Sequence, residues 1–280
     1  MEDLPRLKAR IANLKELGDL MRALRALAAS HVQEAQSALP GIRRYAEVVE
    51  EAIAEAATLS AAAAGGGGGP VPRGQDVLIV VCSEHGFAGD FNDRLLDRAE
   101  TALGNGRRLG IVGRRGAIVA EERGLDALWQ VPMATHVGGV PAIARQVVEA
   151  LASAATAEVV AASYRKGGGC EVAVKRVLPL DPALFASAGR RAPPLHHLAP
   201  AELLERLAGE YLFAELTHAV TESLASENGA RLRVMETADR NIGEKLESLG
   251  RRAHALRQEA ITTELLDVVT GSEAVLARPE

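Results

Sequence analysis

The stretch LPRLKARIANLKELGDLMRALRALA, residues 4–28, repeats its apolar residues at alternating steps of three and four. This heptad spacing is typical of a helix that buries one stripe against another helix. The stripe consists of Leu4, Leu7, Ile11, Leu14, Leu17 or Gly18, Met21, Leu24 and Ala28. The pattern continues to about residue 59, with a kink or break expected at Pro40. A helix of about 55 residues is roughly 80 Å long, so it must protrude or pair with a second long helix.

A second long helix is predicted at the other end of the chain, where residues 201–270 contain no proline. A heptad stripe recurs there, formed by Ile242, Leu246, Leu249, Ala253, Leu256 and Ala260. Because neither helix is expected to be stable alone, we expect the two to pair as an antiparallel coiled coil. The first helix is the shorter one, so part of the second should remain unpaired.

Strand and helix patterns alternate between the two long helices. Apolar runs predict strands at 76–82, 107–113, 157–165 and 171–180, and amphipathic patterns predict helices at 91–103, 117–124 and 140–154. This alternation indicates a Rossmann-like α/β domain with a mostly parallel sheet, whose last two strands form a hairpin through KGGG. The expected organisation is therefore a coiled-coil helix (1–59), a flexible glycine-rich linker (60–75), an α/β domain (76–200) and a coiled-coil helix (201–280).

Composition limits the classes of function. The net charge of −5 and the aromatic content of 3 % argue against a nucleic-acid-binding protein. Cys82 and Cys170 lie far apart and form no CxxC pair, so no metal site is expected. We expect no signal peptide and no membrane-inserted segment, because no run of about 18 apolar residues exists. A cytoplasmic location follows, and a peripheral role at a membrane stays open.

The loop CSEHGFAGDFN, residues 82–92, follows a strand and precedes a helix, which is where α/β sheets bind ligands. It lacks the GxGxxG spacing of a dinucleotide site. His85 with Glu84 or Asp90 could form an acid–base pair, but no nucleophile motif accompanies them. A tight turn made by Gly86 and Gly89 is favoured instead. The sequence therefore predicts no catalytic, cofactor-binding or metal-binding residues.

Four stretches resemble the γ subunit of F-type ATP synthases, the central rotor shaft. They are RIANLKELGDLMRALRALAASHVQEAQ (10–36), SEHGFAGDFN (83–92), SLASENGARLRVMETADRN (223–241) and ALRQEAITTELLDVVTGSEAV (255–275). The last two resemble long and specific family motifs, and the resemblance runs from about Leu4 to Val275. The loop 82–92 looks like the alternative, sodium-type bacterial branch of the family.

This resemblance implies a non-catalytic subunit without cofactors, because the family carries out its chemistry in the β subunits. It implies as partners the α and β subunits of the catalytic ring, the ε subunit and the c-subunit ring. Arg257, Gln258 and Thr262 resemble the positions that contact the β-subunit catch loop, and Leu24 matches a further β-contact position. The apolar LLDVV (265–269) resembles the part held in the bearing of the ring. The implied location is the cytoplasmic face of the bacterial inner membrane, bound peripherally.

The residues themselves, apart from the resemblance, leave two other functions open. One is a Rossmann-like nucleotide-binding enzyme with helical extensions, which predicts a nucleotide at loop 82–92. The other is a coiled-coil scaffold, which predicts a homodimer formed through the two seams.

Overall fold

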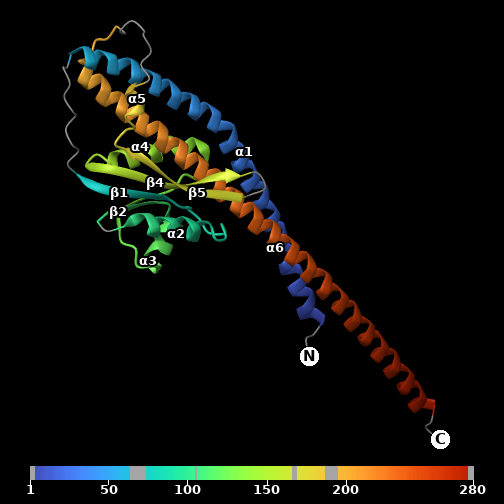
Figure 1. Cartoon of the computed structure of the whole chain (residues 1–280). Coiled ribbons are helices and arrows are strands. Elements are labelled where there is room, and N and C mark those ends of the chain that lie inside the picture. Colours follow the sequence, from blue (N-terminus) through green and yellow to red (C-terminus); the bar gives the residue numbers. More distant parts are fainter. Residues whose placement is uncertain (1–3, 64–73, 105, 166–168, 187–194, 277–280) are drawn as a thin grey trace. The chain divides into compact units, whose positions relative to one another are not determined.

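The computed structural model describes residues 4–63, 74–104, 106–165, 169–186 and 195–276 (Figure 1). Two long helices, α1 (Leu4–Ala63) and α6 (Pro200–Leu276), precede and follow an α/β domain. The elements between them are β1 (Gln75–Val81), α2 (Phe91–Leu103), β2 (Arg108–Val112), α3 (Arg114–Glu122), β3 (Ala127–Val131), a short 3-10 helix η1 (Val137–Gly139), α4 (Val140–Ala150), β4 (Ala154–Arg165), β5 (Gly169–Leu178) and α5 (Ala183–Ala186). The chain divides into two compact units, residues 27–234 and residues 1–26 with 235–280.

The five strands form one sheet in the order β3-β2-β1-β4-β5. The first four are parallel and β5 runs antiparallel to β4, which is the mostly parallel sheet expected from the sequence. Both faces are covered (Figure 1). One face packs against α4 and the Leu212–Leu224 stretch of α6, and the other packs against α2 and α3. Burial on both faces explains why β1 is an uninterrupted apolar run.

Most predicted elements are confirmed, and the differences have physical reasons. The edge strand β3 was not predicted, because in its sequence ALWQV only Val131 is buried. The KGGG connection lies mostly outside the described residues, but Arg165 pairs with Gly169 as a hairpin requires. The predicted flexible linker falls mainly on residues 64–73, which also lie outside the described residues. The helix α1 reaches Ala63, past the expected end at residue 59.

A kink or break was expected at Pro40, and the break is wrong, because α1 continues through this proline as one helix. A proline removes one backbone donor from a helix, which normally favours a kink or break there. Pro40 itself is exposed, and the seam positions Ala35 and Leu39 just before it are buried. Packing along the seam therefore outweighs the lost hydrogen bond.

Within the unit of residues 27–234, α1 and α6 pair in antiparallel fashion. The Arg43 guanidinium donates to His218 Nε2 at 3.1 Å and to Glu222 Oε1 at 3.1 Å, and Tyr45 donates to Glu210. Partners of later α1 residues thus lie earlier in α6. Seven buried positions of α1 in this unit keep the heptad spacing, and Ala54 is buried beside them; the seven are Ala28, Val32, Ala35, Leu39, Val49, Ile53 and Ala56. The many alanines among them allow the two helices to approach closely.

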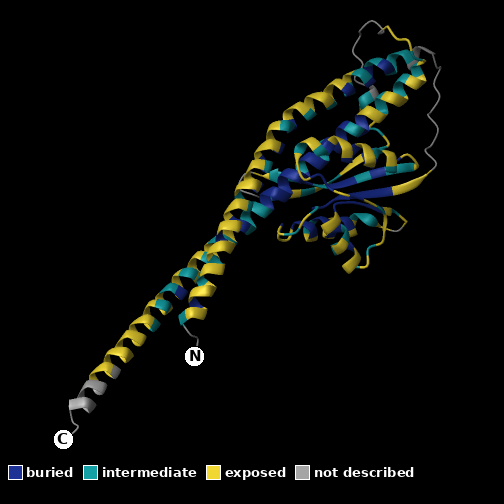
Figure 2. Cartoon of the chain, turned by 180° about the vertical axis from the view of Figure 1, so that it is seen from behind, coloured by how far each residue is buried: buried dark blue, intermediate teal, exposed yellow. Residues whose placement is uncertain are grey.

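The described residues of the second unit, 4–26 and 235–276, are all helical. Arg22 and Arg25 both pair with Asp239, and a Cβ placed on Gly18 would lie 3.4 Å from Ile242 Cγ2, so α1 and α6 are again antiparallel. The predicted stripe of α6 is buried or half-buried through Leu256. Ala260, which was expected to continue it, is exposed. In the part of the chain that the structure describes, α1 begins at Leu4, and the described residues of α1 leave Ala260 exposed. From Arg257 to Val269 every side chain that the structure describes is exposed (Figure 2).

Gly116 of α3 allows this helix to pack closely against Cys82 at the end of β1. A Cβ on Gly116 would lie 2.0 Å from the Cβ of buried Cys82. We expect Gly116→Ala to lower the free energy of unfolding by about 2 kcal/mol, because the helix must move away from the strand. Gly243→Ala is the matched control, because no atom lies within 4 Å of its added Cβ, and it should be neutral or stabilising. Urea denaturation of both variants measures the difference, and equal midpoints would contradict the packing argument.

Candidate partner-contact site

The exposed part of α6 from Arg257 to Val269, here called the free segment, begins with polar side chains. Thr262 Oγ1 donates to the Gln258 carbonyl at 2.9 Å, and Thr263 Oγ1 donates to the Glu259 carbonyl at 3.0 Å. These hydroxyls keep lone pairs that can accept from a partner. Among the residues that the structure describes, neither the Arg257 guanidinium nor the Gln258 side-chain amide has a hydrogen-bond partner. The first turns of the free segment therefore present unused donors to another molecule.

The second half of the free segment is apolar. Its exposed large side chains are Ile261, Leu265, Leu266, Val268 and Val269, and Leu265 and Val268 are 61 % and 69 % exposed. Such a contiguous apolar surface is costly to leave in water, since each buried Å² of it stabilises by about 25 cal/mol. Patches of this kind mark interaction sites. The change from polar to apolar side chains along this helix is consistent with insertion of its end into an apolar surface of another protein.

The fourth predicted contact residue, Leu24, lies elsewhere in the same helical unit. It is half-buried on α1, between Arg22 and Arg25, which both pair with Asp239 of α6. Arg257 lies about five helical turns, or roughly 27 Å, further along α6 from Asp239. The structure therefore groups Arg257, Gln258 and Thr262 on one exposed stretch and places Leu24 apart from them.

Loop 82–92, the position proposed for a nucleotide in the alternative interpretation, is closed by its own side chains. The Glu84 carboxylate accepts from the backbone N–H groups of Met133 at 2.8 Å and Arg114 at 3.1 Å, and its other oxygen lies 3.0 Å from Arg114 Nε. It thereby joins the segments that follow β1, β2 and β3, where a doubly wound sheet would receive a ligand. The buried Asn92 amide and Ser83 bond to each other. His85 and Asp90 are exposed, and the described residues include no cluster of potential metal ligands.

Replacing Glu84 tests this structural role. We expect Glu84→Ala to lower the free energy of unfolding by about 2 kcal/mol, because it leaves the partly buried Met133 N–H without an acceptor. Glu84→Gln keeps one acceptor oxygen and should lose less. Urea midpoints for the two variants give the comparison, and an alanine variant as stable as the unmodified chain would show that the carboxylate does not hold the loops.

Glu227, in the motif SLASENGARLR, was not among the residues predicted from the sequence to carry chemistry. Its side chain is 3 % exposed, and its Oε1 lies 2.5 Å from Arg231 Nη2. Burial raises the pKa of Glu227 to about 7, and the nearby Arg231 charge only partly opposes this. Arg231 also bonds to Asn228 and reaches the Gly86 carbonyl at 3.4 Å. The i, i+4 spacing of Glu and Arg was visible in the sequence, but their burial against loop 82–92 was not.

The fold and the free segment define a coiled-coil subunit that acts through a protein partner. Residues 3–275 match the sequence profile of a family described as ATP synthase. The γ chain of the ATP synthase from Fuscovulum blasticum is 30 % identical and aligns over 98 % of this chain and 100 % of its own length. The γ chain from Geotalea daltonii is 25 % identical, over 98 % and 99 % of the two chains. The chain therefore belongs to the ATP synthase γ chain family.

Solved structures agree on the fold. A chain of the Euglena gracilis mitochondrial ATP synthase, in a structure of its OSCP, F1 and c-ring, superposes with a TM-score of 0.68 at 13 % identity, covering 98 % of this chain and 95 % of that one. A chain from the central stalk and c-ring of the Tetrahymena thermophila enzyme gives a TM-score of 0.52 at 18 % identity, covering 78 % and 99 %. Two long helices flanking a central mixed sheet are thus the shared fold.

Membership of this family assigns the chain to the non-catalytic subunits of ATP synthase, as the resemblance implied. The alternative interpretation as a nucleotide-binding enzyme is not supported, because the full-length relatives are γ chains. Among the described residues, no helix is long and apolar enough to cross a membrane.

Proposed function

We propose that this chain works as the central rotor shaft of an F-type ATP synthase, coupling ion flow through the membrane sector to conformational change at catalytic β subunits. The observation that carries this proposal is the free segment, in which α6 continues past its helical partner with every described side chain exposed from Arg257 to Val269. A helix end that is polar and then apolar, and exposed in its own unit, is suited to contact with another subunit.

Coupling follows from differential contact. A single helix end is not rotationally symmetric, because the side chains around it differ. Each β subunit of a surrounding ring therefore meets different groups at each angle of the shaft. A ligand or partner shifts an equilibrium only by its difference in affinity for the two states. A contact difference of about 1.4 kcal/mol changes the affinity of a site tenfold.

The contact residues take different roles in this proposal. Arg257, Gln258 and Thr262 hydrogen-bond the catch loop of a β subunit, and Leu24 of α1 contacts β at a separate level. The side-chain donors of Arg257 and Gln258 suit contacts that form and break during a turn, because no internal hydrogen bond has to be broken first; the Thr262 hydroxyl, which donates to the Gln258 carbonyl, can accept from the partner. The apolar half of the free segment rotates in an apolar bearing formed by the α and β subunits.

The remaining partners complete the assembly. We place the ε subunit and the c-ring at the α/β domain, and the whole complex at the cytoplasmic face of a bacterial inner membrane, with this chain bound peripherally. The transport of protons or sodium ions takes place in the membrane sector. Membership of the sodium-type branch stays a prediction, which the ion dependence of the assembled enzyme tests. The domain boundaries at residues 59, 75 and 200 also remain predictions.

Reconstitution tests the proposal. The chain is mixed with the cognate α and β subunits, and the product is separated by size and its subunit ratio measured. We expect one copy of the chain in each ring of three α and three β subunits, with altered ATP hydrolysis. A homodimer that does not join the ring would support the scaffold alternative and refute the shaft.

A further inference from the structure

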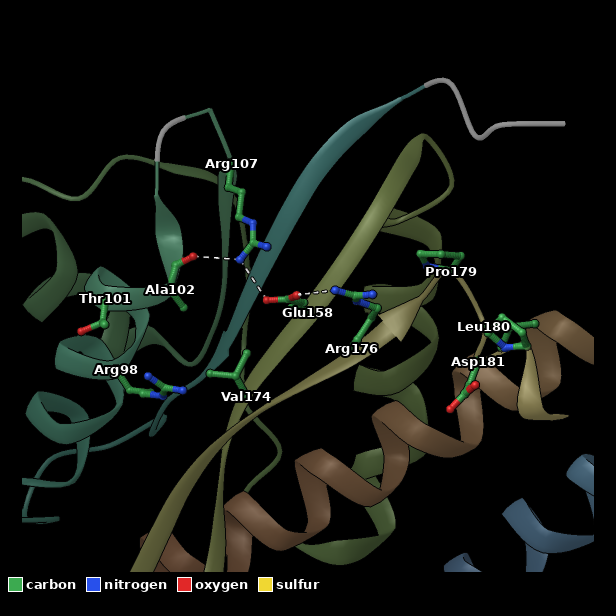
Figure 3. A pocket seen from close by; sticks show the side chains of 11 residues that line it. Arg98, Thr101, Ala102, Arg107, Glu158, Val174, Arg176, Pro179, Leu180 and Asp181 are labelled. Atoms are coloured by element: carbon green, nitrogen blue, oxygen red, sulfur yellow. Dashed lines mark hydrogen bonds and ion pairs between the residues drawn. The ribbon is translucent and has the colours of Figure 1, made fainter.

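A pocket of about 930 Å³ lies on the face of the sheet that α2 covers, beside β4 and β5 (Figure 3). Three arginines from three different elements line it. Arg98 comes from α2, Arg107 from the segment just before β2, and Arg176 from β5. The free segment and loop 82–92 contribute nothing to this lining, so the proposed shaft function does not account for the pocket.

Glu158 of β4 holds two of these arginines in place. Arg107 Nη1 donates to Glu158 Oε2 at 2.9 Å and to the Ala102 carbonyl at 2.8 Å. Arg176 lies directly opposite Glu158 in the β4–β5 ladder, with its Nη2 3.7 Å from Glu158 Oε1. One carboxylate therefore orients two guanidinium groups and compensates only one of their charges. The remaining N–H groups of both arginines stay available for an anion.

The third arginine adds a charge without a counterion. Within the part of the chain that the structure describes, the Arg98 side chain makes no ion pair or hydrogen bond, and it extends from α2 toward Val174 (Figure 3). The other carboxylate of the lining, Asp181, accepts from the backbone N–H of Ala183 at 2.9 Å. Three guanidinium groups thus meet two carboxylates, and the pocket has a positive net charge.

The uncharged lining is mostly apolar, with Ala102, Val174, Pro179, Leu180 and Pro182 beside the hydroxyl of Thr101. A volume near 930 Å³ is in the range of sites for small organic molecules and exceeds the need of a simple inorganic anion. A phosphoryl group has oxygens on three sides and close to two negative charges, which suits arginine donors that come from separate directions. A carboxylate has two oxygens in one plane and would leave one direction unmatched.

We propose that this pocket binds an organic phosphate, with the phosphoryl group on Arg98, Arg107 and Arg176 and the apolar body against Val174, Pro179 and Leu180. The phosphoryl group can come from a soluble nucleotide or from the headgroup of a phospholipid. The chemistry at the arginines is the same for both, and the two sources are distinguished by experiment.

Isothermal titration of the full chain with AMP and with inorganic phosphate tests the soluble source. We expect AMP to bind more tightly, because adenosine covers the apolar wall. Arg98→Ala should weaken AMP binding about tenfold or more, since a charge-assisted contact is lost. Arg98→Glu should abolish it. Both changes are at an exposed side chain that bonds to no other described residue, so the fold should persist. Arg115→Ala, at an exposed arginine of α3 outside the pocket, is the matched control and should not change the affinity.

Co-flotation with phosphatidylcholine vesicles, with and without phosphatidic acid, tests the lipid source. If AMP does not bind but phosphatidic-acid vesicles carry the unmodified chain and not the Arg98→Glu variant, a lipid headgroup supplies the phosphate and the pocket is supported. The proposal is overturned if neither AMP nor the vesicles bind. It is also overturned if binding weakens equally in Arg98→Ala and Arg115→Ala, because general surface charge would then account for it.

Discussion

The double variant Arg257→Ala/Gln258→Ala is expected to lower ATP hydrolysis by the reconstituted complex about a hundredfold. Loss of one charge-assisted and one neutral hydrogen bond removes about 3 kcal/mol from the contact that drives the β subunit, and each 1.4 kcal/mol is a factor of ten. The effect should be on turnover and not on folding, because neither side chain bonds to another described residue. Steady-state hydrolysis at saturating ATP measures it.

The chain offers a matched control for this variant. Arg240 and Asn241 form another exposed arginine–amide pair on α6, but within the stretch that α1 accompanies. Arg240→Ala/Asn241→Ala should leave turnover within about twofold, because no β contact is proposed there. Thr262→Ala should have an intermediate effect, since its hydroxyl already donates to the Gln258 carbonyl. If the two double variants behave alike, the catch assignment is wrong.

The second large effect is a pH dependence of stability that originates at Glu227. Burial raises the pKa of this carboxyl from 4.5 to about 7, against the lowering effect of Arg231. Between these values the folded chain binds more protons than the unfolded chain, so the free energy of unfolding falls as pH rises. A pKa shift of this size lowers the free energy of unfolding by about 3 kcal/mol between pH 4.5 and pH 7. Above pH 7 the whole of this loss is present.

Glu227→Gln removes this titration while keeping an oxygen that accepts from Arg231. We expect its stability relative to the unmodified chain to increase by about 3 kcal/mol between pH 4.5 and pH 7. Glu236→Gln, at an exposed glutamate of the same helix, should show no comparable trend. Urea denaturation at a series of pH values gives the difference curves. A flat difference for Glu227→Gln would mean that the buried carboxylate is ionised throughout.

The two long helices and the parallel strands β1, β2 and β4 could be predicted because they depend on local periodicity, whereas the exposed edge strand β3 could not. The stripe from Leu4 to Leu24 and the seam from Ile242 to Leu256 each repeat over several turns, and each predicts burial against another helix. The difference in helix length predicted that part of α6 would lack a partner. The candidate contact residues came from the resemblance of their motif, since spacing alone does not identify a partner.

Features made by distant residues could not be predicted. From the sequence alone, Glu84 is a candidate acid. The structure shows instead that its carboxylate accepts hydrogen bonds from the backbone N–H groups of Met133 and Arg114. The arginine pocket combines residues 98, 107 and 176, which only the register of β4 and β5 and the position of α2 bring together. The helix through Pro40 and the exposure of Ala260 depend on where a partner helix is present, and local pattern contains no such information.

Rotation of the chain inside its complex tests the central claim most directly. With the β subunits fixed to a surface, a bead is attached to a cysteine introduced at exposed Glu121 of α3; the native Cys82 and Cys170 are both buried, so labelling is selective. The account predicts rotation in one direction that requires ATP and slows in the Arg257→Ala/Gln258→Ala variant. Continued ATP hydrolysis with a stationary bead would contradict it, because the chain would then be a fixed support and not a shaft.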